Sequence, residues 1–192
     1  MKDVIKLPIK IFVDQAHNPE SHDTGLTDNI PHEHDLTYKV GVELAQLLRN
    51  DNRFEVRLSR LSPTSIIGTD VESSIKERVN MANEWPADYF IGIHNNIDTE
   101  IGKSGTIIFV KDTPNLLARS IMDSIIKQTG SKDGGIYKAE GYTLQNLNMP
   151  AAVISLGYLS ALIDIVKYDT DTKKFAQGIY EGLVNYIDKY KS

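Results

Sequence analysis

Short apolar runs alternate along this chain with longer segments whose apolar residues recur at helical spacing. The strand-like runs are "KIFVD" (10–14), "FEVRLS" (54–59), "DYFIGIH" (88–94) and "GTIIFV" (105–110). Between the first two, Leu36, Val40, Leu44 and Leu47 fall on one side of an amphipathic helix. Strands that alternate with helices predict an α/β fold with a largely parallel sheet covered on both faces.

The rest of the chain continues this alternation. Further helices are expected over 73–85, ended by Pro86, over about 114–129, closed by Gly130, and over about 172–190. Further strands are expected around 142–144 and at 151–156. With 192 residues and no internal repeat or linker, we expect one domain over 1–192.

Composition excludes several classes of function. The absence of cysteine removes disulfides, thiolate metal sites and cysteine nucleophiles. A net charge of −5 without a basic stripe argues against a nucleic-acid partner. No apolar run approaches the ~20 residues of a membrane span. No signal peptide is visible at the start, so the sequence favours either a chain that is cytoplasmic at synthesis or a domain excised from a longer exported protein.

Two histidines follow the ends of predicted strands. His17 comes three residues after "KIFVD", and His94 ends "DYFIGIH". Ligands of open α/β sheets bind at that edge, and Glu33 opens the first long helix after a loop that can return there. Two histidines and a carboxylate with an open fourth position form a common catalytic zinc set. The alternatives are hydrogen-bonded structural histidines and a first-turn acid that stabilises the helix dipole.

The loop after the first strand offers other candidate ligands. It contains His22, His32 and His34, and the segment "HEH" (32–34) has three consecutive potential metal ligands. Adjacent residues at a helix start point about 100° apart, so one of the three is expected to face the site.

The order of several short motifs resembles one enzyme family. The motifs are "VDQAHN", "EHDLTYKVGVELAQLL", "VRLSR", "ERVNMAN", "ADYFIGIHNN", "GTIIFV", "YTLQNLNMPAAVISLGYLS" and "AQGIYEGLVNYI". In this order they resemble the zinc-dependent N-acetylmuramoyl-L-alanine amidases of the amidase-3 type, over about residues 10–188. The resemblance implies a single α/β domain with a twisted sheet of about six strands and helices on both faces.

The resemblance also implies roles for individual residues. His17, Glu33 and His94 match the three Zn²⁺ ligands of the family, which leaves His22, His32 and His34 as non-ligands. Asn95 and Asn96 follow a ligand histidine and are candidates for substrate contact or for turn formation. Arg60, Arg78, Asn80 and Asn83 are interpreted as residues that maintain the fold. "DQAHN" departs from the glycine-rich surroundings that the family has at this histidine.

The last strand carries the largest departure. The family pattern near its C-terminus has a glutamate that serves as general base, and that glutamate aligns with Ser155 in "MPAAVISLGYLSA". A serine hydroxyl has no useful pKa near neutrality, so Ser155 cannot replace it. No G-x-S-x-G turn supports a serine nucleophile. Glu140 is the leading candidate for a substitute base, followed by Glu20 and Asp23, although a solvated loop residue is the plainer interpretation of Glu140.

By resemblance, the expected function is zinc-dependent hydrolysis of the amide between N-acetylmuramic acid and L-Ala in peptidoglycan. Loss of a general base costs ~10²–10⁴-fold in rate, so weak activity is expected. The alternative is a zinc-binding pseudoenzyme that recognises cell-wall muropeptide without cutting it. A third hypothesis is a structural domain without metal, which the retention of all three ligands disfavours. The resemblance implies a place in the cell envelope or outside the cell.

Overall fold

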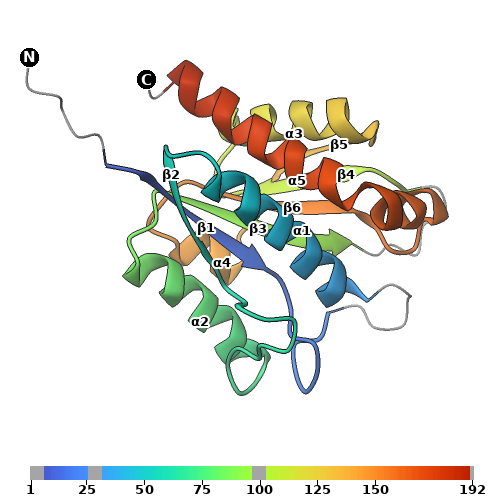
Figure 1. The fold of residues 1–192 in the computed structure, drawn as a ribbon. Helices are drawn as coiled ribbons and strands as arrows, with labels where there is room; N and C mark the ends of the chain where they lie inside the picture. Colours follow the sequence, from blue (N-terminus) through green and yellow to red (C-terminus); the bar gives the residue numbers. More distant parts are fainter. Residues whose placement is uncertain (1–6, 26–31, 97–102, 191–192) are drawn as a thin grey trace, which may run out of the picture.

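The computed structural model describes residues 7–25, 32–96 and 103–190. Its centre is one six-stranded sheet with the strand order β2-β1-β3-β6-β4-β5 (Figure 1). The strands are β1 (Ile9–Gln15), β2 (Phe54–Leu58), β3 (Tyr89–Asn96), β4 (Thr106–Val110), β5 (Asp133–Lys138) and β6 (Ala151–Tyr158). Neighbouring strands are parallel except for β4 and β6, which are antiparallel. The predicted mostly parallel sheet is confirmed.

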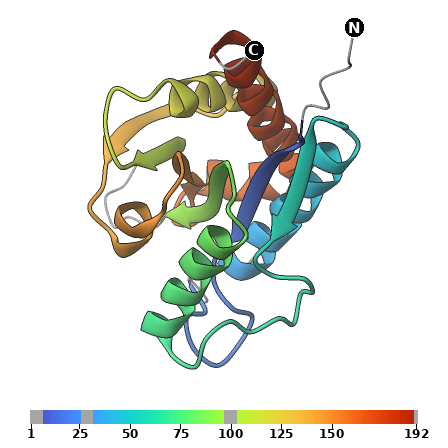
Figure 2. The same cartoon turned by 90° about the vertical axis from the view of Figure 1, so that its left-hand side faces the viewer.

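Helices cover both faces of the sheet, as predicted (Figures 1 and 2). They are α1 (Glu33–Arg49), α2 (Val71–Glu84), α3 (Leu116–Thr129), α4 (Tyr142–Asn146) and α5 (Leu162–Tyr190). On one face α1, α3 and α5 bury the larger core, which includes Leu44, Ile91, Ile154 and Ile179. On the other face α2 covers a smaller core, in which Phe12 and Phe90 stack with ring centroids 5.7 Å apart.

Three elements differ from the sequence expectations. The strand expected around 142–144 is wrong, because these residues form the short helix α4, in which only Leu144 is buried. Strand β5 is not predicted by the sequence, because "DGGIYK" begins with an aspartate and two glycines and its residues are half-buried or exposed at the sheet edge. Helix α5 begins before residue 172, but its backbone breaks from helical geometry at Asp171 (φ −119°), so the predicted helix corresponds to the part after this kink.

The strand directions decide where a site can form. Because β1, β3 and β6 are mutually parallel, their C-terminal ends meet at one edge of the sheet. Strand β4 runs the opposite way, so it begins at that same edge with Thr106. Residues that follow β1, end β3 and end β6 are thereby brought together with residues that start β4.

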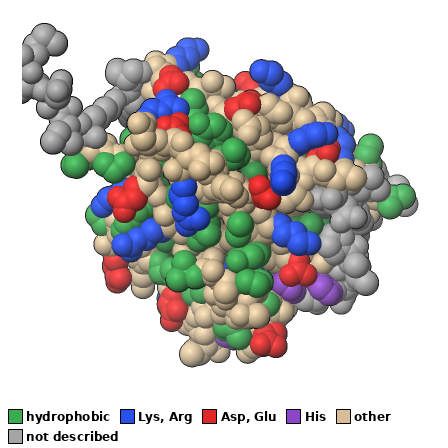
Figure 3. Space-filling model, viewed as in Figure 1, with side chains coloured by type: hydrophobic (Ala, Val, Ile, Leu, Met, Phe, Trp, Pro, Cys, Tyr) green, Lys and Arg blue, Asp and Glu red, His purple; other side chains and the backbone are tan. Residues whose placement is uncertain are grey.

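The face of the molecule in Figure 3 carries both signs of charge among its described residues. Acidic and basic side chains are interspersed over the face in Figure 3, without a continuous basic band. Among the described residues, no helix is long and apolar enough to cross a membrane.

Candidate functional site

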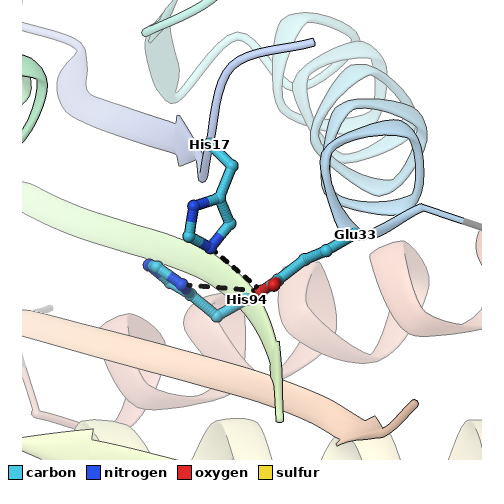
Figure 4. Close-up of side chains that lie close together, drawn as sticks. All are labelled: His17, Glu33 and His94. Carbon is cyan, nitrogen blue, oxygen red and sulfur yellow. Dashed lines mark ion pairs between the residues drawn. The ribbon is translucent and has the colours of Figure 1, made fainter. Parts of the chain in front are cut away.

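His17, Glu33 and His94 converge at the edge where β1 and β3 end (Figure 4). His17 lies in the loop after β1, Glu33 is the first residue of α1, and His94 lies near the end of β3. Glu33 Oε1 is 3.2 Å from His17 Nε2 and 3.8 Å from His94 Nδ1. One potential ligand atom from each residue lies within 4.8 Å of the others, so the group can hold a metal ion.

The loop after β1 turns sharply to present the His17 ring. His17 itself has a left-handed backbone (φ 68°), as have Ser21 and Asp23. The loop returns so that Asp23 Oδ1 lies 2.9 Å from His17 Nδ1, while Asp23 Oδ2 accepts a hydrogen bond from Ser74 Oγ of α2 at 2.6 Å. A hydrogen bond from Nδ1 to Asp23 leaves Nε2 directed at Glu33, which is the orientation that a metal ligand needs.

Glu33 is held from two sides although it is almost fully buried. Its Oε1 accepts a hydrogen bond from the backbone N–H of Asn95 at 2.8 Å. Burial raises the pKa of this carboxyl, but the bonds and charges of His17, the Asn95 N–H and His94 outweigh it, so the pKa is lowered. The carboxylate therefore stays ionised, as a metal ligand must.

The two histidines differ in their protonation. Burial lowers the pKa of His17, but its hydrogen bonds to Asp23 and Glu33 and their charges outweigh burial and raise the pKa to about 9. Burial and the nearby charge of His17 lower the pKa of His94 to about 4. Without a metal, a proton on His17 occupies the space between its Nε2 and Glu33. A bound cation would displace this proton and satisfy the same two groups.

Gly25 lies directly against the side chains of His17 and Glu33. Its backbone is left-handed (φ +66°), and a Cβ there would lie 2.6 Å from His17 Cδ2 and 2.9 Å from Glu33 Oε2. A larger residue would therefore push apart two of the three candidate ligands. The sequence alone assigns this glycine no role at the site.

Buried polar residues anchor the loop that carries His17. Arg78 of α2 forms an ion pair with Asp14 at 2.6 Å and donates to the backbone oxygens of Gln15 and His17. Asn18 is fully buried and exchanges hydrogen bonds with the backbone of Ile67. The polar residues of "DQAHN" thus belong to a loop that is fixed by hydrogen bonds.

Two further polar residues also bond backbone groups. Arg60 donates to the backbone oxygens of His34 and Pro63, and Asn83 bonds the backbone of Asn146 and Asn148. These contacts support the interpretation of Arg60, Arg78 and Asn83 as residues that maintain the fold. Asn80 is exposed on α2.

The other histidines of this region lie outside the group of His17, Glu33 and His94. His22 Nε2 is 3.1 Å from the backbone oxygen of Ile67. His34 Nδ1 is 3.3 Å from the backbone oxygen of Thr24, and the His32 and His34 rings stack with centroids 5.4 Å apart. Among the described residues only His17, Glu33 and His94 form such a group.

Ser155 lies beside His94 on the neighbouring strand. The two residues pair in the parallel β3–β6 register, so their side chains project from the same face of the sheet about 5 Å apart at the backbone. Ser155 is buried, and its hydroxyl is 3.4 Å from the backbone oxygen of Gly157. A longer side chain at this position would extend over the same face as His94.

The structure does not bring Glu140 to this group. Glu140 follows β5, whose last residue Lys138 pairs with Val110 at the end of β4. Because β4 runs antiparallel to β6, this end of β4 lies near the start of β6, roughly 10 Å along the strand from Ser155. Glu140 is exposed there, with Lys138 Nζ 4.0 Å from its carboxylate.

The two asparagines after His94 face opposite ways. Successive residues alternate along a strand, so Asn95 points to the α1 and α5 face, where it is nine-tenths buried. Asn95 contributes its backbone N–H to Glu33 rather than a side chain to the His94 face. Asn96 pairs with Tyr158 and returns to the His94 face, half-buried.

Comparison with known proteins places this arrangement in context. Residues 11–185 match the family model described as N-acetylmuramoyl-L-alanine amidase. The chain is 31% identical to N-acetylmuramoyl-L-alanine amidase CwlM of Bacillus licheniformis over 92% of the chain, and 30% identical to the sporulation-specific N-acetylmuramoyl-L-alanine amidase of Bacillus subtilis over 94%. It spans 66% and 68% of the lengths of these relatives.

The fold has a matching solved structure. An N-acetylmuramoyl-L-alanine amidase from Clostridium difficile 630 superposes with a TM-score of 0.84 at 25% identity, covering 96% of this chain and 99% of that one. The architecture, including the six-stranded sheet with helices on both faces, is therefore that of this group of proteins.

Proposed function

The chain belongs to the N-acetylmuramoyl-L-alanine amidase family, and we propose that it is a zinc-dependent hydrolase of the amide between N-acetylmuramic acid and L-Ala in peptidoglycan. The observation that carries the proposal is the convergence of His17, Glu33 and His94 at one edge of the sheet. Other relatives are named cell wall amidases, which fits a place of action in the cell wall.

The chemistry of the donor set fits zinc. Imidazole nitrogen suits Zn²⁺, Zn²⁺ also accepts a carboxylate oxygen, and two histidines with one glutamate form one of the three-ligand sets of catalytic zinc sites. When bound, the ion supplies Lewis-acid activation of a water molecule and of the scissile carbonyl.

The chain's own residues would hold the ligands in place. Asp23 fixes the His17 ring through Nδ1, and the Asn95 N–H fixes Glu33. Arg78 ties the His17 backbone oxygen to the buried Asp14 carboxylate. A site whose ligands are bonded in advance loses less entropy when it takes up the ion and the substrate.

Ser155 occupies the position where the resemblance expects a proton-accepting glutamate. We infer that the chain lacks a general base there, because a hydroxyl cannot accept a proton near pH 7. Such a loss corresponds to a rate lower by about 10²–10⁴-fold than that of a relative with the glutamate. A protein that binds muropeptide and zinc without cutting is the limiting case of this inference.

The proposal is tested by incubation of the zinc-loaded protein with purified peptidoglycan, scoring new L-Ala amino termini. The wild type should release them slowly, and His94→Ala should release none and lose zinc. Ser155→Glu should raise the rate by about 10²-fold or more. Ser155→Gln should not raise it, because glutamine has the size of glutamate but cannot act as a base. Release by His94→Ala at the wild-type rate would contradict the proposed site. No release by the wild type or by Ser155→Glu, with zinc bound, would contradict the proposed activity.

A further inference from the structure

A groove continues the site face of the sheet beyond Ser155. The antiparallel register pairs Ile107 with Ser155 and Phe109 with Val153, so both β4 side chains project from the face that carries His94. Tyr137 pairs with Phe109 in the parallel β4–β5 register and faces the same way. Together with neighbouring residues these side chains line an open groove of about 530 Å³.

A β-bulge in β6 directs the ring of Tyr158 toward this groove. Between the pairs His94–Ser155 and Asn96–Tyr158, β6 holds one residue more than β3. The extra residue shifts the alternation of β6, so that Tyr158 projects to the same face as Asn96 and lines the groove. The floor is thus apolar and aromatic, and it begins directly beside Ser155.

The aromatic floor is open to a ligand. Tyr137 is 51% exposed, and the centroid of its ring lies 6.4 Å from that of Phe109. Its hydroxyl donates to the backbone oxygen of Gly134 at 3.0 Å, which holds the ring against the sheet.

The charge of the groove is positive at the end nearest the site. Lys103 and Lys132 line that end, where β4 and β5 begin. Among the described residues that line this end, the acid is Asp133, of which one oxygen accepts from Arg119 at 2.9 Å and the other from the backbone N–H of Gly135. Lys132 is exposed, in a chain whose net charge is −5. This end of the groove therefore complements an anionic group.

The distance from His94 to the groove determines which part of a substrate can reach the groove. Ile107 lies two strands away from His94, which is about 10 Å at the strand spacing of a sheet. An extended peptide covers about 3.5 Å per residue, so a chain that starts at the His94 site enters the groove at its second or third residue.

Resting on the proposed function, we propose that this groove binds the stem peptide of the substrate, with a carboxylate of the second residue near Lys132. The stem peptide carries free carboxylates, whereas the lactyl carboxyl of the muramic acid is consumed in the scissile amide and the sugar rings are uncharged. The positive end of the groove therefore favours the peptide over the glycan. Tyr137 and Phe109 provide the apolar surface for the residues that follow.

The test measures binding of the free product peptide, which requires no bond cleavage. The probe is L-Ala-γ-D-Glu-L-Lys-D-Ala, titrated into the ¹⁵N-labelled full chain, and the amide signals of Phe109 and Tyr137 should shift. Lys132→Gln should weaken binding by up to about fivefold, the upper end of the range for one exposed ion pair. Amidation of the D-Glu α-carboxyl should weaken binding by the wild type to a similar extent and have no further effect on Lys132→Gln.

Lys138→Gln is the matched control, because it removes the same charge at the far end of β5, from the face opposite to Tyr137. It should bind as the wild type does. Equal losses in Lys132→Gln and Lys138→Gln, no binding of the peptide, or groove shifts caused by the N-acetylglucosamine–N-acetylmuramic acid disaccharide instead of the peptide would each overturn the proposal. Peptide binding of the expected pattern without any hydrolysis of peptidoglycan would refute the proposed activity and leave the groove assignment standing.

Discussion

Replacement of Gly25 by alanine is expected to damage the candidate metal site through one misplaced methyl group. The new Cβ would lie 2.6 Å from His17 Cδ2, 2.7 Å from His17 Cγ and 2.9 Å from Glu33 Oε2. Contacts this short do not persist, so the imidazole and the carboxylate must move apart. The backbone adds a second cost, since Gly25 has φ +66°.

The two costs can be separated with a control elsewhere in the chain. Gly130, at the end of α3, has φ +63° and no atom within 4 Å of the position of a Cβ. Gly130→Ala therefore carries the left-handed backbone cost of about 1–2 kcal/mol without a clash. Gly25→Ala carries the same cost plus about 1–3 kcal/mol for overpacking. At this chain length, 1 kcal/mol corresponds to a change in Tm of roughly 2–4 °C.

The assay is zinc affinity, measured by competition with a chelating dye, beside thermal unfolding of the metal-free protein. Gly25→Ala should lose at least about tenfold in affinity, the equivalent of about 1.4 kcal/mol, because its clash falls on two ligands. Gly130→Ala should lose stability and keep its affinity. The reasoning would be refuted if Gly25→Ala bound zinc as tightly as the wild type, or if both variants lost affinity equally.

Three further outcomes are expected. Asp23→Asn should lower zinc affinity by about 10–100-fold, because the His17 ring loses its anionic partner. Ser74→Ala, which removes a hydrogen bond to Asp23, should lower zinc affinity less. Equal zinc affinity in Asp23→Asn and the wild type would contradict this role of Asp23. His34→Ala should keep one zinc per chain by elemental analysis, and a loss of zinc would place His34 among the ligands. Hydrogen bonds from Arg53 lower the pKa of Asp51 to about 2, below its usual 3.8, so the stability from this pair is present above about pH 4 and lost as the pH falls toward 2. Between about pH 4 and pH 2, the free energy of unfolding of Asp51→Asn should therefore fall less than that of the wild type. The difference should be less than about 1 kcal/mol, since Arg53 is partly exposed, and an equal fall in both proteins would rule out this contribution.

The sequence predicts the sheet core and the convergence of the three candidate ligands well, for a physical reason. Buried parallel strands are continuous apolar runs, and their C-terminal ends must share an edge. The positions of His17 and His94 relative to these runs are therefore enough to place both at one edge. Strand β5 cannot be found in this way, because its stability comes from pairing with β4 and not from its own composition.

The hydrogen bonds that hold the candidate ligands in place cannot be predicted from the sequence. Asp23 reaches His17 only because the loop between them adopts left-handed backbone at several residues, a conformation that its residue types do not announce. The sequence makes Asp23 a candidate substitute base, whereas in the structure its carboxylate is bonded to His17 and Ser74. Similarly, the sequence draws attention to the side chain of Asn95, whereas the structure uses its backbone N–H.

On the proposed function, the three candidate metal ligands and Ser155 belong to separate parts of the fold. The candidate ligands belong to β3, α1 and the loop after β1, and the groups that hold them are Asp23, the Asn95 N–H and Arg78. Ser155 belongs to β6, and its link to His94 is the pairing of two backbones, which a serine and a glutamate form equally well. On the proposed function, a change at Ser155 is therefore expected to act on proton transfer and to leave zinc affinity in place. Ser155→Glu, measured both for zinc affinity and for hydrolysis of peptidoglycan, tests directly whether binding and cutting are separable.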